Sequence, residues 1–117
     1  MDKTNIQLVK LIEALKKQAS VEGVDLWSRI ATDLEKSTRK RPIVNLYKIN
    51  KCTKQEETII IPGKVLSMGE LDHRVNIAAF NFSGNAAAKI IKARGKILSI
   101  YELLKTNPKA KDVRIIV

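Results

Sequence analysis

The chain begins with apolar residues at helical spacing. Within residues 6–20 the apolar positions lie three or four residues apart and form one stripe, which predicts an amphipathic helix whose core-facing residues are Leu8, Leu11, Ile12, Leu15 and Ala19. Thr4 and Gln7 have the spacing of a capping box, which would fix the start of this helix.

A second apolar stripe follows Gly23, which interrupts the first helical pattern. We expect Asp25 to cap a helix over residues 26–35, because an aspartate side chain accepts hydrogen bonds from the free N–H groups at a helix start. Trp27 lies on the apolar stripe of that helix. Because a tryptophan in such a stripe buries a large apolar area, we interpret Trp27 as a core residue and not as a platform for base stacking.

Beyond Pro42 the helical period gives way to a mixed pattern, since proline prevents a helix from running through this point. Residues 44–49 are compatible with a strand or with a strand that runs into a helix. The β-branched run of residues 58–61 predicts a strand. The Pro62-Gly63 pair predicts a turn, after which residues 64–66 continue in an extended conformation.

Apolar and polar side chains then alternate over residues 74–79, which predicts a half-buried strand. The phase of the alternation changes towards Phe80 and Phe82, which indicates a bulge or a twist. We expect Ser83 to cap a helix that runs to Arg94 and ends at Gly95. The narrow apolar face of this helix comprises Ala86, Ala87, Ile90, Ile91 and Ala93.

Two more strands, residues 97–100 and 113–117, are predicted with a short helical turn at residues 101–105 between them. The predicted fold class is α+β, or mixed α/β, with two N-terminal helices followed by a small mixed β-sheet and one or two packed helices. We expect one domain over residues 1–117, made of a helical unit (1–35), a basic connector (36–42) and a basic α/β unit (43–117).

The charge of the chain is unevenly distributed. Its 22 Lys and Arg outnumber its 12 Asp and Glu, which gives a net charge of +10. Residues 1–35 carry five basic and six acidic side chains, whereas residues 36–117 carry 17 basic and six acidic ones, a net charge of +11. Self-repulsion of this size destabilises a compact fold unless a polyanion supplies countercharge, and nucleic acid is the commonest such partner.

The location that the sequence predicts is cytoplasmic. Cys52 is the single cysteine, so an internal disulfide cannot form, as is typical of a reducing compartment. No apolar run approaches the ~18 residues of a membrane helix. The first residues lead directly into an amphipathic pattern and have no signal-peptide core.

Catalytic motifs are missing. His73 is the single histidine, and adjacent residues such as Asp72 and His73 are not expected to face each other as in a catalytic triad. Pro62-Gly63-Lys64 resembles a phosphate loop but lacks its Ser or Thr and its first glycine. We therefore expect no enzymatic activity, no cofactor, no metal site and no small-molecule substrate.

Basic residues instead form three groups, on the connector, along the helix after Ser83 and near the C-terminus. Lys89, Lys92 and Lys96 have the spacing of one helix face, and the free N–H groups at the start of this helix could bind a phosphate or serve as an ordinary cap. Contacts with phosphates, sugars and RNA shape are expected rather than base reading. The candidate RNA-binding residues are Lys36, Arg39, Lys40, Arg41, Lys48, Lys64, Arg74, Lys89, Lys92, Arg94, Lys96, Lys109, Lys111 and Arg114.

Several strings, in this order and spacing, resemble the large-subunit ribosomal protein eighteen-e family of archaea and eukaryotes. They include Asp25-Leu26-Trp27-Ser28-Arg29-Ile30-Ala31, Pro62-Gly63-Lys64-Val65-Leu66, Ala78-Ala79-Phe80, Leu98-Ser99-Ile100 and Val113-Arg114-Ile115-Ile116. That family is similar over its α/β part to the bacterial large-subunit ribosomal protein fifteen. The length suggests the shorter archaeal form.

The resemblance implies N-terminal helices and a small mixed sheet bound to large-subunit rRNA beside other ribosomal proteins, without catalysis or cofactor. Lys36, Lys64, Lys89 and Arg114 lie within matching strings. Two positions depart from the family pattern: Arg94 stands where the family often has the first glycine of a pair, and Ser67 stands where it has a glycine.

Three hypotheses follow: a structural rRNA-binding protein of the ribosome, a free-standing RNA- or DNA-binding module such as an RNA-processing or nucleoid factor, and an RNA-modifying enzyme. The first is favoured by the charge distribution and the resemblance. Replacing Arg39 or Arg41 by alanine is expected to weaken RNA binding with little loss of stability.

Overall fold

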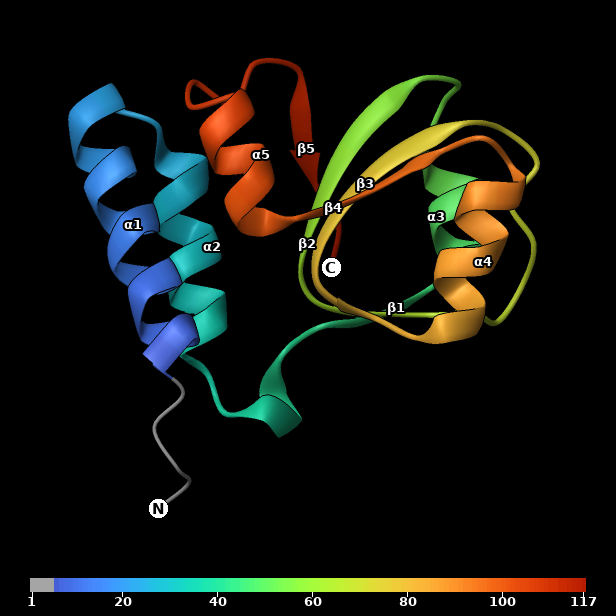
Figure 1. Ribbon diagram of the computed structural model, residues 1–117, viewed down its shortest axis with the longest axis horizontal. Coiled ribbons are helices and arrows are strands. Elements are labelled where there is room, and N and C mark those ends of the chain that lie inside the picture. Colours follow the sequence, from blue (N-terminus) through green and yellow to red (C-terminus); the bar gives the residue numbers. More distant parts are fainter. Residues whose placement is uncertain (1–5) are drawn as a thin grey trace.

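A computed structural model describes residues 6–117 and shows a central sheet between two layers of helices (Figure 1). One layer contains α1, α2 and α5, and the other contains α3 and α4. Thr4 of the expected capping box lies outside the described residues. The helices are α1 (Ile6–Glu22), α2 (Asp25–Glu35), the 3-10 turn η1 (Thr38–Lys40), α3 (Leu46–Cys52), α4 (Gly84–Lys92) and α5 (Ile100–Thr106). The strands are β1 (Ile43–Asn45), β2 (Glu57–Leu66), β3 (Val75–Phe82), β4 (Lys96–Ser99) and β5 (Val113–Ile115).

The strands form a five-stranded sheet with the order β1-β2-β3-β4, and β5 also pairs with β2. The predicted class, N-terminal helices followed by an α/β unit, is confirmed. The sheet itself is not mixed, because every pairing in it is parallel. A parallel pair needs a crossover connection, and α3, α4 and α5 supply three of these crossovers. Of the two possibilities for residues 44–49, the strand that runs into a helix is the one observed.

Two hydrophobic clusters cover the two faces of the sheet. Ile59 and Ile61 of β2 face the cluster under α3 and α4, while Ile60 between them faces the cluster under α1, α2 and α5. In β3, Ile77 and Ala78 divide between the clusters in the same way. The expected half-buried strand is therefore buried on both faces, as is typical of parallel sheets covered by helices.

The core position of Trp27 is confirmed, since its side chain is fully buried between the N-terminal helices and the sheet. Its indole Nε1–H donates a hydrogen bond to the main-chain oxygen of Pro108 at 2.6 Å. A buried tryptophan normally finds such a partner for its one polar atom. The bond joins α2 to the loop between α5 and β5.

Side chains cap two of the four α-helices, α2 to α5, whose N-cap residues lie within residues 6–117. Ser83 Oγ accepts from Ala86 N, which confirms the expected cap of α4. Asp25 is instead the first residue of α2, and Val24 precedes it without a side-chain cap. Ile100, expected in a strand, begins α5, because Ser99 and Glu102 form a capping box at this point.

The backbone at the end of α4 restricts which residues fit at positions 94 and 95. Arg94 takes the left-handed conformation with φ 67°, and Arg94 N donates to Ile91 O. Glycine adopts this conformation without a steric cost, so a glycine at this position would suit the backbone better than arginine does. Gly95 is needed for a different reason: an added Cβ would lie 2.3 Å from the main-chain oxygen of Val75.

Pro62 and Gly63 lie within β2, so the predicted turn was wrong. The register between β2 and β3 shifts by one residue between Ile61 and Lys64, which places a bulge at this point in β2 and not in β3. Gly63 faces the connector: an added Cβ would lie 1.9 Å from the main-chain oxygen of Pro42, and that oxygen accepts from Lys64 N at 3.0 Å.

We predict that Gly63→Ala lowers the free energy of unfolding by roughly 1–3 kcal/mol or more, because the added methyl group overlaps main-chain atoms that cannot move aside. Gly84→Ala is the control, since no other atom lies within 4 Å of its added Cβ and alanine favours the first turn of a helix. Urea denaturation of both variants measures the difference. Equal stability of the two variants would contradict the contact between Pro42 and Gly63.

Candidate nucleic-acid interface

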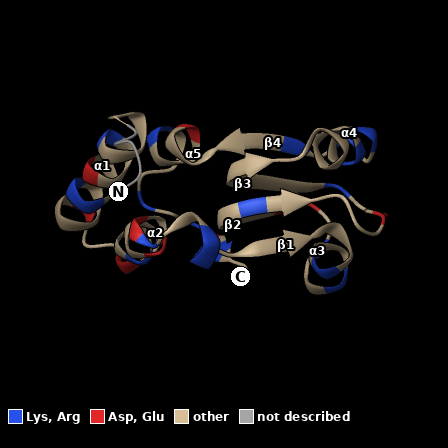
Figure 2. Ribbon diagram, turned by 90° about the horizontal axis from the view of Figure 1, so that it is seen from below, with Lys and Arg blue, Asp and Glu red and all other residues tan. Residues whose placement is uncertain are grey.

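The balance of basic and acidic side chains differs between the N-terminal helices and the rest of the fold. Figure 2 shows basic and acidic positions together on α1 and α2, and mainly basic positions on η1, α3, α4 and the start of β4. The charge asymmetry of the sequence therefore becomes an asymmetry in space. The fourteen candidate residues divide further, according to whether their side chains have partners within residues 6–117.

Four candidate residues form ion pairs with nearby carboxylates, and one of them, Lys89, also contacts main-chain oxygens. Lys36 Nζ lies 3.1 Å from Asp33 Oδ1, and Arg74 Nη1 lies 2.9 Å from Glu56 Oε1. Arg114 makes a two-bond contact with Glu57, from Nε at 2.8 Å and from Nη2 at 3.2 Å, and also donates to the main-chain oxygen of Cys52. These pairs already supply local countercharge, so less of their charge is available to an external anion.

Lys89 fastens the loop after β2 to α4. Its Nζ donates to the main-chain oxygens of Ser67 and Gly69 at 3.0 and 2.9 Å, and lies 3.0 Å from Glu70 Oε1. The sequence placed Lys89 on one helix face with Lys92 and Lys96. The structure separates them, because the Lys89 side chain turns to this loop while Lys92 and Lys96 are exposed.

The side chain of Arg41 joins the connector to α2 and to β3. Its Nε and Nη2 donate to the main-chain oxygen of Leu34 at 3.3 and 3.1 Å, near the end of α2. The guanidinium also lies 5.2 Å from the centre of the Phe80 ring. A cation at a helix C-terminus and over an aromatic ring contributes to stability. Lys48 likewise contacts the protein itself, through the main-chain oxygen of Val117.

The other eight candidate side chains are exposed and have no hydrogen-bond or ion-pair partner among the described residues. We divide them into a connector group (Arg39, Lys40 and Lys64), a corner group at the end of α4 and the start of β4 (Lys92, Arg94 and Lys96), and a loop group before β5 (Lys109 and Lys111). Unpaired cations that share a small region raise the local potential and attract anions.

Within residues 36–117, two further cations are exposed and unpaired although the sequence did not single them out. Lys51 and Lys54 lie at and just after the end of α3, and both are exposed. Neither side chain has a hydrogen-bond or ion-pair partner within residues 6–117. Their position within residues 36–117, which carry a net charge of +11, was the only signal that could have identified them, because they belong to no dense basic run.

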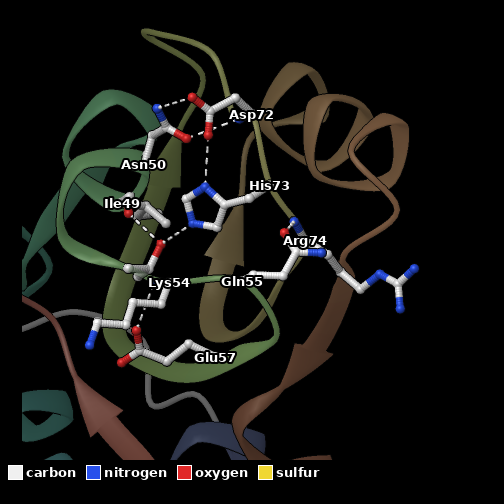
Figure 3. Close-up of polar contacts among 9 residues, drawn as sticks. Ile49, Asn50, Lys54, Gln55, Glu57, Asp72, His73 and Arg74 are labelled. Carbon is white, nitrogen blue, oxygen red and sulfur yellow. Dashed lines mark hydrogen bonds and ion pairs between the residues drawn. The ribbon is translucent and has the colours of Figure 1, made fainter.

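Figure 3 shows the one histidine in a polar network. His73 Nδ1 lies 2.8 Å from Asp72 Oδ1, and Nε2 lies 2.8 Å from Thr53 Oγ1. The expectation that Asp72 and His73 do not face each other was therefore wrong. The hydrogen bonds from His73 and Asn50 lower the pKa of Asp72.

The network resembles a hydroxyl–imidazole–carboxylate relay, but its hydroxyl group donates its hydrogen bond to a main-chain oxygen. Thr53 is buried, and its Oγ1 donates to the main-chain oxygen of Ile49 at 2.6 Å. Asn50 also accepts from the main chain of Asp72 at 2.9 Å. The network therefore joins the loop before β3 to the end of α3, which is a structural task.

Residues 6–117 contain neither a metal-binding cluster nor a membrane-spanning helix. No group of three or more His, Cys, Asp or Glu side chains in this part of the chain is placed to hold a metal ion. None of its helices is both long enough and apolar enough to cross a membrane.

Comparison with known proteins identifies relatives along almost the whole chain. Residues 2–117 match the family model described as ribosomal protein 60S L18 and 50S L18e. A large ribosomal subunit protein eL18 from Methanothermobacter thermautotrophicus is 45% identical over 97% of this chain and 94% of its own length. Proteins of the same name from Sulfurisphaera tokodaii and Methanoregula boonei are 46% and 47% identical, over 96% and 99% of this chain and 92% and 96% of their own lengths.

The structure separates the two connector arginines that the sequence treated alike. We predict that Arg41→Ala lowers the free energy of unfolding by about 1–3 kcal/mol, because it removes charged hydrogen bonds to Leu34 O and the contact with Phe80. Arg39→Ala, the matched control, should change it by less than about 0.5 kcal/mol. Chemical denaturation distinguishes the two variants, and an equal loss in both would refute the assignment.

Proposed function

Because the chain belongs to the family of ribosomal proteins 60S L18 and 50S L18e, we propose that it is a structural constituent of the large ribosomal subunit that binds rRNA through phosphate and shape contacts. In this role it supports subunit assembly and translation in the cytoplasm. Neighbouring large-subunit proteins are its other partners. It acts without catalysis, cofactor or small-molecule substrate.

One observation carries the rRNA-binding part of the proposal: the eight exposed candidate cations lack countercharge among the described residues. A protein with a net charge of +10 gains stability when a polyanion covers such groups. Each Lys or Arg that neutralises a phosphate also releases condensed counterions, which favours binding. The connector, corner and loop groups are therefore the proposed phosphate contacts.

The paired cations have a second task in this proposal. Lys36 pairs with Asp33 at the end of its own helix, whereas each of the other five connects one element or loop to another: Arg41, Lys48, Arg74, Lys89 and Arg114. They fix the surface on which the unpaired cations lie. Rigid placement lowers the entropy that the protein loses when it binds a folded RNA.

The alternative is a free-standing nucleic-acid-binding module, which the same charge would serve. The two functions differ in their preference for RNA structure. A ribosomal constituent should prefer folded large-subunit rRNA to duplex DNA at matched salt, whereas a nucleoid factor should bind DNA at least as tightly.

We predict that the protein sediments with large ribosomal subunits when a native extract is fractionated on a sucrose gradient at low salt. High salt should release part of it, because screening weakens phosphate contacts. Immunoblotting of the fractions measures the distribution. Detection of the protein only in ribosome-free fractions would refute the ribosomal role.

We also predict that the double variant Arg39→Ala/Lys40→Ala binds large-subunit rRNA more weakly and with a salt dependence that is shallower by about one to two in the slope of log K against log salt. The control is Lys10→Ala/Lys17→Ala, which removes the same charge from α1. Filter binding over a salt series measures both. An equal loss of affinity in the two variants would show that net charge, and not the connector group, determines binding.

A further inference from the structure

A small apolar pocket lies where the connector crosses the sheet. It has a volume of about 110 Å³, and its walls come from Thr38 and Arg41 of the connector, Ile43 of β1, the bulge at Gly63, and Phe80 with Asn81 of β3. Pockets that hold cofactors usually measure ~300–1,000 Å³. This one has room for a single planar ring.

The walls of the pocket are held in place before any ligand arrives. Arg41 is fixed by its hydrogen bonds to Leu34 O and by its position over the Phe80 ring. The bulge is fixed by the bond from Lys64 N to Pro42 O and by the close approach of Pro42 to Gly63. A preformed pocket loses little entropy when it binds.

Polar and charged groups without partners surround this apolar interior. Asn81 Oδ1 accepts from Phe82 N at 3.0 Å, and its amide Nδ2 has no partner among the described residues. Lys64 lies on the pocket wall, and Arg39 and Lys40 belong to the same 3-10 turn as Thr38. The pocket thus combines ring-sized apolar walls, one hydrogen-bond donor and a cationic rim.

We propose that this pocket receives one unpaired base of the rRNA, with the flanking phosphates held by Arg39, Lys40 and Lys64. The inference rests on the proposed function and adds a base contact to it. Proteins bind RNA loops and bulges by stacking a splayed base on an aromatic ring or an arginine plane, and Phe80 and Arg41 supply both. Asn81 Nδ2 then donates to an acceptor on the edge of the base.

A base fits this pocket better than an apolar side chain of a protein partner does. Every base brings a phosphate on each side, and these phosphates match the three unpaired cations at the rim. An apolar side chain would fill the interior and leave that charge uncovered. The sequence predicted contacts with phosphates, sugars and RNA shape and no reading of bases. The proposed pocket adds one base contact to that prediction.

A pocket-filling variant tests the proposal. Ile43 and Ile91 are exposed to similar extents, 61% and 58%, but only Ile43 lines the pocket. We expect Ile43→Trp to weaken binding to large-subunit rRNA by about tenfold or more with an unchanged salt slope, and Ile91→Trp to bind like the wild type. Equal binding of the wild type and Ile43→Trp, or a loss that appears as a shallower salt slope, would overturn the inference.

A measurement on the wild-type protein keeps the test independent of folding of the variants. Ultraviolet crosslinking of the complex with large-subunit rRNA, followed by mass spectrometry, should identify a single nucleotide attached to the peptide that contains Phe80. Chemical probing should show the edge of that base protected by the wild type and exposed with Ile43→Trp. Tight, salt-sensitive rRNA binding without this crosslink or protection would sink the base pocket and leave the proposed function intact, whereas absence of rRNA binding would refute the proposed function itself.

Discussion

The contact between the carbonyl group of Pro42 and Gly63 is the constraint on which the connector, the sheet and the proposed interface all depend. Two strands pair with the same edge of β2: β1 pairs with residues 64–66 and β5 pairs with residues 58–60. The bulge at Pro62-Gly63 lies between these two pairings. A residue larger than glycine would push the connector away from β2, and the wall of the small pocket would move with it.

The cations of the protein perform two different tasks, and their partners decide which. Arg41 and Lys89 use their charge within the protein, where each holds a loop or a helix end against a neighbouring element. Arg39 and Lys92, on the same connector and the same helix, point to solvent without a partner among the described residues. Density of charge along the sequence therefore overstates the number of side chains that are available to RNA.

The molecule is thin in one dimension. The described chain measures 36 × 34 × 18 Å, with the sheet between two helical layers (Figure 1). Apolar side chains on both faces of β2 and β3 stabilise this arrangement without a large single core. The strand ends and loops, where backbone groups are less constrained, then carry most of the unpaired cations.

Local chemistry allowed the sequence alone to determine the two N-terminal helices, the burial of Trp27, the Ser83 cap, the uneven charge and the family. Each depends on residues close together in the chain or on ordered strings along it. The parallel direction of the strands, the place of Pro62-Gly63 inside β2 and the partners of Arg41 and Lys89 were decided only by the tertiary structure. The physical reason is that these features depend on main-chain atoms brought together from distant segments. No spacing of side-chain types along a single chain records which carbonyl group will lie beside which glycine or lysine.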